Sequence, residues 1–145
     1  MLLDVKKYPD PILGKKSKEI SKITPDIQKL ILDMIETMHK NKGIGLAGVQ
    51  VGILKRVIVC DVGKGPLVLI NPKITKREGG AISEEGCLSV PETFINIKRA
   101  EKITVEGLDE RGEKRVIKTK GMLSYCIQHE VDHLDGIIIL DKQKI

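Results

Sequence analysis

The feature that most constrains the fold is the segment His129-Glu130-Val131-Asp132-His133, near the C-terminal end of the chain. It lies within an apolar stretch, residues 122–134, whose hydrophobic periodicity predicts a helix. Residues four apart share one helical face, with Cβ atoms about 6 Å apart, so His129 and His133 can both reach one metal ion. Glu130 lies about 100° around the helix, where its carboxylate can border the open side of the metal and take a proton from water. The fold must therefore bring an upstream segment to this helix to complete the site.

The identity of that upstream ligand follows partly from elimination. A catalytic metal needs a third protein ligand if one position stays open for water and substrate. Asp141 could serve only through a fold-back of the chain. Cys126 lies about 10.5 Å along the helix axis from His133, too far to share an ion, and is interpreted as a small buried residue beside the site. Cys60 ends an apolar strand and is interpreted as core, which favours Cys87 as the third ligand.

The two paired histidines have an alternative interpretation as surface residues that bind no metal. The chain has 3 histidines, and two of them could have the metal-binding spacing by accident on a solvated surface. The apolar helix that surrounds them argues against that interpretation. His39 falls at the end of another predicted helix, and we expect it to be solvated and without a partner.

Hydrophobic periodicity predicts an α+β fold. Thr24 as N-cap and Pro25 at the first helical position predict a helix that ends near residues 41–43. The segment before it, residues 2–21, is polar and punctuated by prolines, and we expect it to lie over the surface. We expect a single domain over residues 1–145, with small antiparallel or mixed sheets around the helix that carries the two histidines. Strand-like patterns cover residues 57–60, 67–70 (ended by Asn71-Pro72), 94–97, 103–106, 115–119 after a hairpin turn at 109–112, and a short final strand at 137–140.

Composition excludes several classes of protein. The chain has 145 residues, of which 41% are hydrophobic and 31% charged, as in a globular protein with its own core. Aromatic residues make up only 2%, which disfavours a binder of single-stranded nucleic acid. The formal net charge is +5, spread along the chain without long runs, so we expect no DNA partner. Asp4 falls where a signal peptide would need an apolar segment, and no apolar run could span a membrane. The odd number of cysteines fits a reducing compartment, so we expect a cytoplasmic protein.

A glycine-rich segment follows the first predicted helix. Residues 43–48 match the letters G-x-G-x-x-G, but a dinucleotide-binding fingerprint follows a strand and opens a helix, so this segment is not one. It could simply end the helix. It could also offer a backbone strip that an extended ligand approaches closely, because side chains are absent there. Gln50, just beyond it, adds an uncharged donor that could face an oxyanion.

Three ordered segments resemble the signature motifs of the peptide deformylases. They are Gly43-Ile44-Gly45-Leu46-Ala47-Gly48-Val49-Gln50, Glu85-Gly86-Cys87-Leu88-Ser89 and Gln128-His129-Glu130-Val131-Asp132-His133-Leu134. The resemblance covers nearly the whole chain. It implies an α+β metalloenzyme that removes the formyl group from the initiator methionine of newly synthesised polypeptides and releases formate. It also implies one divalent ion, Fe2+ as the usual native metal, with Zn2+ or Ni2+ able to replace it.

The resemblance also implies roles for individual residues. Glu130 would be the general acid and base, while Gln50 and the backbone N–H of Leu88 would hold the oxyanion. Gly45 and Ile44 would pair with the substrate backbone, and Glu85 would form a supporting ion pair with Arg99. The implied metal ligands are Cys87, His129 and His133, and the residues around the methionine side chain are Ile44, Met122, Tyr125, Cys126 and His129.

Three departures from the family pattern mark this chain. Gly48 replaces the usual Ala, Phe94 stands where some bacterial members carry Arg near the substrate, and the chain stops soon after the second helix. We expect the chemistry to be intact, because Gly48 leaves Gln50 in register and the missing C-terminal segment carries no signature residue. Formylated nascent peptides and a transient ribosome contact are the expected partners, and the oligomeric state is left open. The alternatives are an H-E-x-x-H metallopeptidase, disfavoured by the missing downstream ligand, and a ribosome- or RNA-binding module with structural zinc, which would not need Glu130.

Overall fold

The computed structural model describes residues 1–142 and has the expected α+β fold. These residues form two helices, α1 (Pro25–Lys40) and α2 (Met122–Leu134), with seven strands between them in the chain and short 3-10 turns. Thr24 caps α1 as predicted, because its hydroxyl accepts a hydrogen bond from the backbone N–H of Ile27 at 3.3 Å. The strands are β1 (Gly45–Ala47), β2 (Val57–Cys60), β3 (Leu67–Glu78), β4 (Ala81–Cys87), β5 (Val90–Arg99), β6 (Lys102–Leu108) and β7 (Lys114–Lys120).

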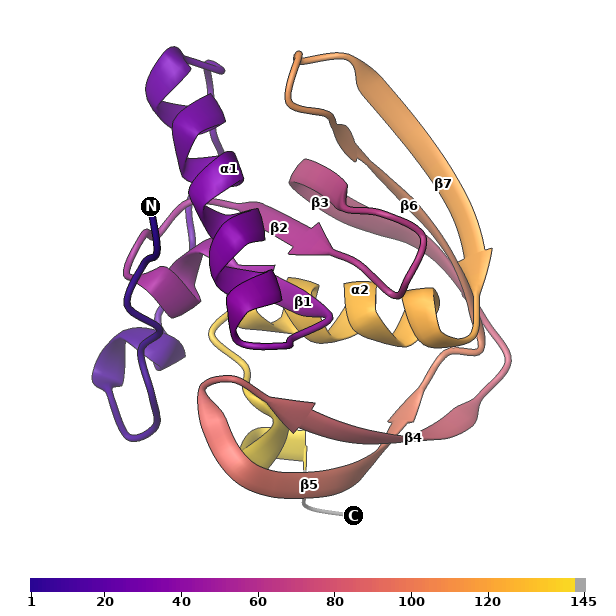
Figure 1. The fold of residues 1–145 in the computed structure, drawn as a ribbon. Helices are drawn as coiled ribbons and strands as arrows, with labels where there is room; N and C mark the ends of the chain where they lie inside the picture. Colours follow the sequence, from indigo (N-terminus) through magenta and orange to yellow (C-terminus); the bar gives the residue numbers. More distant parts are fainter. Residues whose placement is uncertain (143–145) are drawn as a thin grey trace.

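The strands form two separate antiparallel sheets. One has five strands in the order β1-β2-β3-β6-β7, and the other is the β4–β5 hairpin. Helix α1 packs against one face of the larger sheet, over β1 and β2. Helix α2 packs against the opposite face, and Figure 1 shows it between that sheet and the β4–β5 hairpin. The helix with the two histidines is therefore central, as the sequence predicts.

Buried aliphatic residues hold each layer in place. Helix α2 contributes Ile127 and Leu134, both fully buried, to a cluster with Ile58, Leu69 and Val105 of the sheet. A second cluster joins the apolar face of α1 to the other side of the sheet, and a third lies under the β4–β5 hairpin. Burial of aliphatic area at roughly 25 cal/mol per Å2 is the main force that fixes α2 against the larger sheet.

Strand β3 is longer than predicted. Asn71-Pro72 was expected to end it at Ile70, but the strand continues to Glu78. Asn71 adopts a positive φ of 53°, and the pairing with β6 shifts register between Ile70 and Lys73. Such a bulge accommodates a proline, which has no N–H to donate to the ladder, so the two residues bend the strand without ending it. Strands β1 and β4 were not predicted, and the motif residue Cys87 lies at the end of β4.

Two other expectations about chain segments were wrong. The predicted strand at 137–140 is replaced by a 3-10 turn, Ile139–Lys142, in which the Asp141 carboxylate accepts a hydrogen bond from the N–H of Ile138 at 2.9 Å. The N-terminal arm does not only lie over the surface, because Leu13 is 2% exposed and packs under the β4–β5 hairpin. Its apolar residues are spaced irregularly, so periodicity could not reveal which of them are buried.

Candidate metal centre

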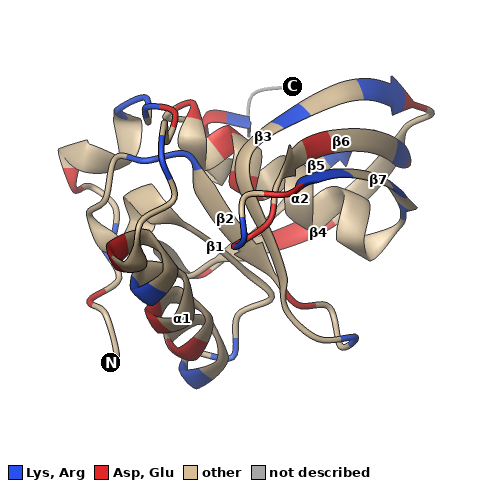
Figure 2. Cartoon of the chain, turned by 90° about the horizontal axis from the view of Figure 1, so that it is seen from above, with Lys and Arg blue, Asp and Glu red and all other residues tan. Residues whose placement is uncertain are grey.

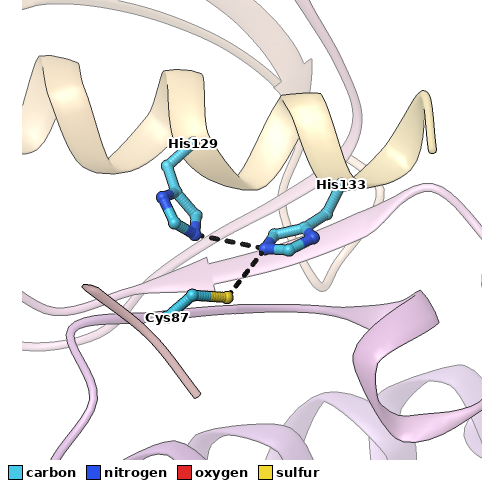
Figure 3. Close-up of side chains that lie close together, drawn as sticks. All are labelled: Cys87, His129 and His133. Atoms are coloured by element: carbon cyan, nitrogen blue, oxygen red, sulfur yellow. Dashed lines mark hydrogen bonds between the residues drawn. The ribbon is translucent and has the colours of Figure 1, made fainter. Parts of the chain in front are cut away.

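Three potential metal ligands from two elements converge at the centre of the molecule. Cys87 ends β4, while His129 and His133 occupy consecutive turns of α2 (Figure 3). The Sγ atom of Cys87 lies 3.3 Å from Nε2 of His133, which lies 3.1 Å from Nε2 of His129. All three ligand atoms lie within 4.8 Å of one another. The site that the spacing predicts is therefore formed in space.

The donor set fits a divalent transition metal. With bonds of about 2.0–2.1 Å to nitrogen and about 2.3 Å to sulfur, tetrahedral ligand atoms lie roughly 3.3–3.6 Å apart, close to the separations found here. His133 is fully buried, and burial lowers its pKa well below the ordinary value, so its imidazole is neutral, the form that binds a metal. Three protein ligands with one position left over are typical of a catalytic rather than a structural site.

A buried carboxylate orients one of the imidazoles. Oε1 of Glu85 lies 2.9 Å from Nδ1 of His129 and accepts a hydrogen bond from its N–H, which leaves Nε2 directed toward His133. Both oxygens of Glu85 also accept hydrogen bonds from Arg99, at 2.7 and 2.9 Å. Burial by itself would raise the pKa of Glu85, but the hydrogen bonds from Arg99 and His129 outweigh it and lower the pKa to about 2. The predicted pairing of Glu85 with Arg99 is therefore present, and it extends to a metal ligand.

Asp132 is a member of this network that sequence reasoning missed. Its Oδ2 accepts a 2.6 Å hydrogen bond from Nη1 of Arg99, whose side chain is only 4% exposed. Asp132 and Glu85 thus balance the buried guanidinium from two sides. The sequence did offer a signal for this role of Asp132, because it is a second carboxylate, besides Glu130, between the two histidines of an apolar helix.

Glu130 lines the same cleft as Cys87 and His129 and has a carboxylate oxygen without a hydrogen-bond partner among the described residues. The residue is 4% exposed, and this oxygen is Oε1. Burial raises the pKa of Glu130 to about 7, near the value that suits a group that both accepts and donates a proton at neutral pH. A buried carboxylate oxygen without a partner is costly, so it indicates a place for a water molecule or a polar substrate group.

Gln50 is fixed beside the thiol. It is 1% exposed, and its Oε1 accepts a hydrogen bond from the N–H of Ala47 at 2.9 Å. That bond directs its Nε2 toward Ser89 Oγ at 3.0 Å and Cys87 Sγ at 3.6 Å. Ser89, which is fully buried, is a positioning residue that sequence reasoning did not single out. Leu88 and Ser89 form the tight turn that joins β4 to β5, which places the backbone of Leu88 next to Cys87.

Gln50, Cys87, Leu88, His129 and Glu130 border a cleft with a volume of about 530 Å3. Ile44, 46% exposed, and Gly45 lie along one side, and β1 is an edge strand whose outer side has no neighbour in the sheet. The first turns of α2 form another side. Its lining includes the predicted substrate-binding residues Ile44, Gly45, Glu85, Met122, Tyr125 and Cys126.

Other residues singled out from the sequence are now placed. Phe94, 71% exposed, lies at the rim of the cleft with its ring against Gly86. Cys60 and Cys126 are buried, as expected. His39 is exposed, as expected, but it has a partner, because its Nε2 lies 2.8 Å from Oδ2 of Asp61, which is 22 residues later in the chain. Such a contact depends on the fold and leaves no local pattern.

The fold and the site together define an α+β metalloenzyme of the hydrolase class. A family model described as "Polypeptide deformylase" matches residues 2–144. The peptide deformylase of Thermodesulfovibrio yellowstonii is 51% identical over 146 aligned positions, which cover 97% of this chain and 88% of the relative. The peptide deformylase of Nitrosococcus oceani is 49% identical, with 97% and 86% covered.

Comparison with solved structures also finds peptide deformylases. The crystal structure of a peptide deformylase from Thermotoga maritima superposes with a TM-score of 0.97 at 40% identity, covering 100% of this chain and 99% of that one. The chain belongs to the polypeptide deformylase family, and it is an enzyme with peptide deformylase activity and a Cys-His-His metal site. Within residues 1–142, no helix has the length and hydrophobicity that crossing a membrane requires.

Proposed function

We propose that this enzyme removes the formyl group from the initiator methionine of newly synthesised polypeptides and releases formate. The observation that carries the proposal is the position of Glu130, which lines the same cleft as Cys87 and His129 and whose buried Oε1 has no hydrogen-bond partner among the described residues. A deformylase must activate water and then protonate a departing amine, and one carboxylate placed here can do both.

We propose that each polar residue of the cleft has one task in this reaction. The metal, when bound, supplies Lewis acidity that polarises water and the formyl carbonyl. Glu130 accepts the proton of the attacking water and passes it to the amine of the methionine as the carbon–nitrogen bond breaks. Nε2 of Gln50 and the backbone N–H of Leu88 donate hydrogen bonds to the oxygen on which negative charge develops. Ala47 and Ser89 support this role of Gln50, because they hold its amide in one orientation.

We propose that the substrate binds in an extended conformation along β1. The unpaired edge of β1 allows a peptide to add as a further strand beside Ile44 and Gly45. Glu85 contributes indirectly, through the orientation of His129. The methionine side chain would lie among Ile44, Met122, Tyr125, Cys126 and His129, which all line the cleft.

We propose Fe2+ as the native metal, with Zn2+ or Ni2+ as replacements. One thiolate and two imidazoles suit all three ions, so selectivity depends on availability more than on affinity. A thiolate beside Fe2+ is prone to oxidation, and we expect aerobic preparations to contain another metal or to lose activity.

We propose that residues 1–145 act as one catalytic domain in the cytoplasm, where formylated nascent chains are made. Two of the three apolar clusters lie on opposite faces of the same sheet, and Ile12 packs against both the first and the third cluster, which supports one domain. The net charge of +5 supports a transient contact with the ribosome.

A single assay tests this function. Purified enzyme is prepared anaerobically, its metal content is measured, and formate release is followed with a formyl-Met tripeptide as substrate. We expect formate in proportion to bound metal, with no cleavage of internal peptide bonds. Cleavage of an internal bond without formate release would instead identify a metallopeptidase, and a closed site with four protein ligands would identify structural zinc.

A further inference from the structure

One face of the five-stranded sheet is only partly covered. Helix α1 packs on this face over β1, β2 and the start of β3, where Val68 and Ile70 are buried. Leu108 of β6 pairs with Ile70 and packs against the same apolar cluster, so alternate residues of β6 share this face. Among residues 1–142, no helix covers the rest of the face, on the second half of β3 and on β6 and β7 (Figure 1).

Lysine dominates this uncovered area. The register places Lys76 and Lys118 on either side of Thr104, and Lys102 between Glu78 and Lys120. Blue segments recur along β3 and β7 in Figure 2. We call the area the lysine face, and its charged members are Lys73, Lys76, Glu78, Lys102, Glu106, Lys114, Lys118 and Lys120.

The charge of the lysine face is strongly one-sided. Six lysines and two glutamates give a net +4, against +5 for the whole chain. Glu78 pairs with Lys76 at 3.2 Å and Glu106 with Lys114 at 3.1 Å. Among the described residues, the other four lysines, Lys73, Lys102, Lys118 and Lys120, have no carboxylate within 4.0 Å of the ammonium group, because Glu78 and Glu106 pair with Lys76 and Lys114. The ammonium groups cover an area about 10 Å across the strands and roughly 20 Å along them, given normal strand spacing.

Stability of the fold does not account for this arrangement. Lys102 lies directly opposite Lys120, and like charges in that position destabilise a sheet. Lysines on β7 could protect an exposed edge from pairing with other chains, but Lys73, Lys76 and Lys102 lie on the inner strands β3 and β6. The excess charge therefore points to a partner that is itself negatively charged.

We propose that the lysine face binds the phosphate backbone of helical RNA. Strands β3, β6 and β7 contain no aromatic residue, so bases cannot stack there, and recognition is limited to the charge and shape of the backbone. A duplex presents closely spaced phosphates to such a surface, and neutralising them releases counterions. The interaction is independent of RNA sequence and weakens steeply with salt.

The lysine face lies next to the active cleft, so RNA bound there would be close to the site of catalysis. Strand β7 ends at Lys120, and Gly121 connects it directly to Met122, which lines the active cleft. The acidic residues of the β6–β7 turn, Asp109, Glu110 and Glu113, lie at the opposite end of these strands. RNA is therefore held at the end nearest the cleft. The use of this contact in meeting nascent chains rests on the proposed function, whereas the binding itself does not.

The test compares two triple variants with the same loss of charge. K102Q/K118Q/K120Q removes three lysines of the face, and K22Q/K40Q/K64Q removes three exposed lysines elsewhere. Binding of a fluorescent RNA duplex of about 20 base pairs is measured by anisotropy from 25 to 200 mM KCl. Formate release from a formyl-Met tripeptide is measured on the same samples. We expect the first variant to lose at least about 10-fold in affinity at 50 mM KCl, and its log–log salt slope to become shallower by about 2 to 3.

The control variant should lose less than about threefold, and both should release formate at the rate of the unmodified enzyme. Equal losses in the two variants would show that only net charge matters and would overturn the proposal. So would the absence of RNA binding at 25 mM KCl, or equally tight binding to polyglutamate, which would indicate an acidic protein as partner. If none of the three proteins releases formate, the proposed function fails while the binding result is unaffected.

Discussion

Glu130 Oε2 lies so close to Gly45 that residue 45 has no room for a side chain. A Cβ at this position would collide with that oxygen and lie 2.8 Å from Sγ of Cys126. Side-chain atoms of Glu130 and Cys126 on α2 therefore lie directly against the backbone of β1. This close approach places the carboxylate of Glu130 next to the strand edge along which a substrate would lie.

Gly45→Ala should consequently damage catalysis without removing the metal. The new methyl group must displace Glu130 or move β1, and a misplacement of about 1 Å can cost about 100-fold in rate. We expect kcat/KM to fall by about this factor while the metal content stays normal. The matched control is Gly14→Ala, because a Cβ there meets no atom within 4 Å. Full activity of the Gly45 variant would contradict the crowding found here.

Glu130→Gln should separate proton transfer from metal binding. The amide keeps the shape of the side chain but cannot accept the proton of water, so we expect turnover to fall at least roughly 100-fold. Glu130→Ala should behave in the same way. Metal content and thermal unfolding should remain close to those of the unmodified enzyme, because Glu130 is not one of the three clustered ligands. Turnover within a few fold of normal would exclude Glu130 as the acid and base.

Cys87→Ala should abolish tight metal binding. The thiolate is one of three ligand atoms, and the two imidazoles alone hold a divalent ion much less tightly. Metal analysis after dialysis should find a ratio of metal to protein near zero. Cys60→Ala, at a buried thiol within the core, is the control and should retain its metal. A normal metal content in the Cys87 variant would mean that the third ligand lies elsewhere.

Glu85→Gln tests the support given to His129. The amide can no longer accept strong hydrogen bonds from both Arg99 and His129, and loss of such a partner typically lowers metal affinity by about 10- to 100-fold. Competition with a chelator measures this affinity directly. Glu84→Gln, at an exposed position on the other side of the same strand, should leave it unchanged. If both variants hold the metal equally well, the hydrogen bond to His129 has no role in binding.

Asp109 should make the stability of the β6–β7 hairpin depend on pH. Its carboxylate accepts hydrogen bonds from the backbone N–H of Glu113 and Arg111, and these lower its pKa from the usual value of about 3.9. The stabilisation is therefore complete above pH 4 or so and is lost as pH falls through the lower pKa of the folded state. Urea unfolding should show that the advantage of the unmodified protein over Asp109→Asn shrinks below about pH 4. A constant difference from pH 7 to pH 3 would contradict this.

Local pattern was sufficient for much of the fold. Thr24 and Pro25 mark the start of α1 because capping depends only on neighbouring residues, and the apolar periodicity of α2 marks its whole length. The short strand β1 could not be predicted in this way, since three residues carry no measurable period. The continuation of β3 past Asn71-Pro72 could not be predicted either. This dipeptide can end a strand or form a bulge, and pairing with β6 decides which.

The sequence by itself determined the chemistry of the site: two imidazoles and a carboxylate on one helix, and a short set of candidates for the third ligand. Helical geometry fixes the relative positions of His129 and His133, so their spacing can be interpreted without a fold. Only the tertiary structure decided that Cys87 meets them, that Asp132 shares Arg99 with Glu85, and that lysines from three strands share one face. Contacts between distant segments depend on how the sheets and helices pack, and that packing is set by the whole core rather than by any local pattern.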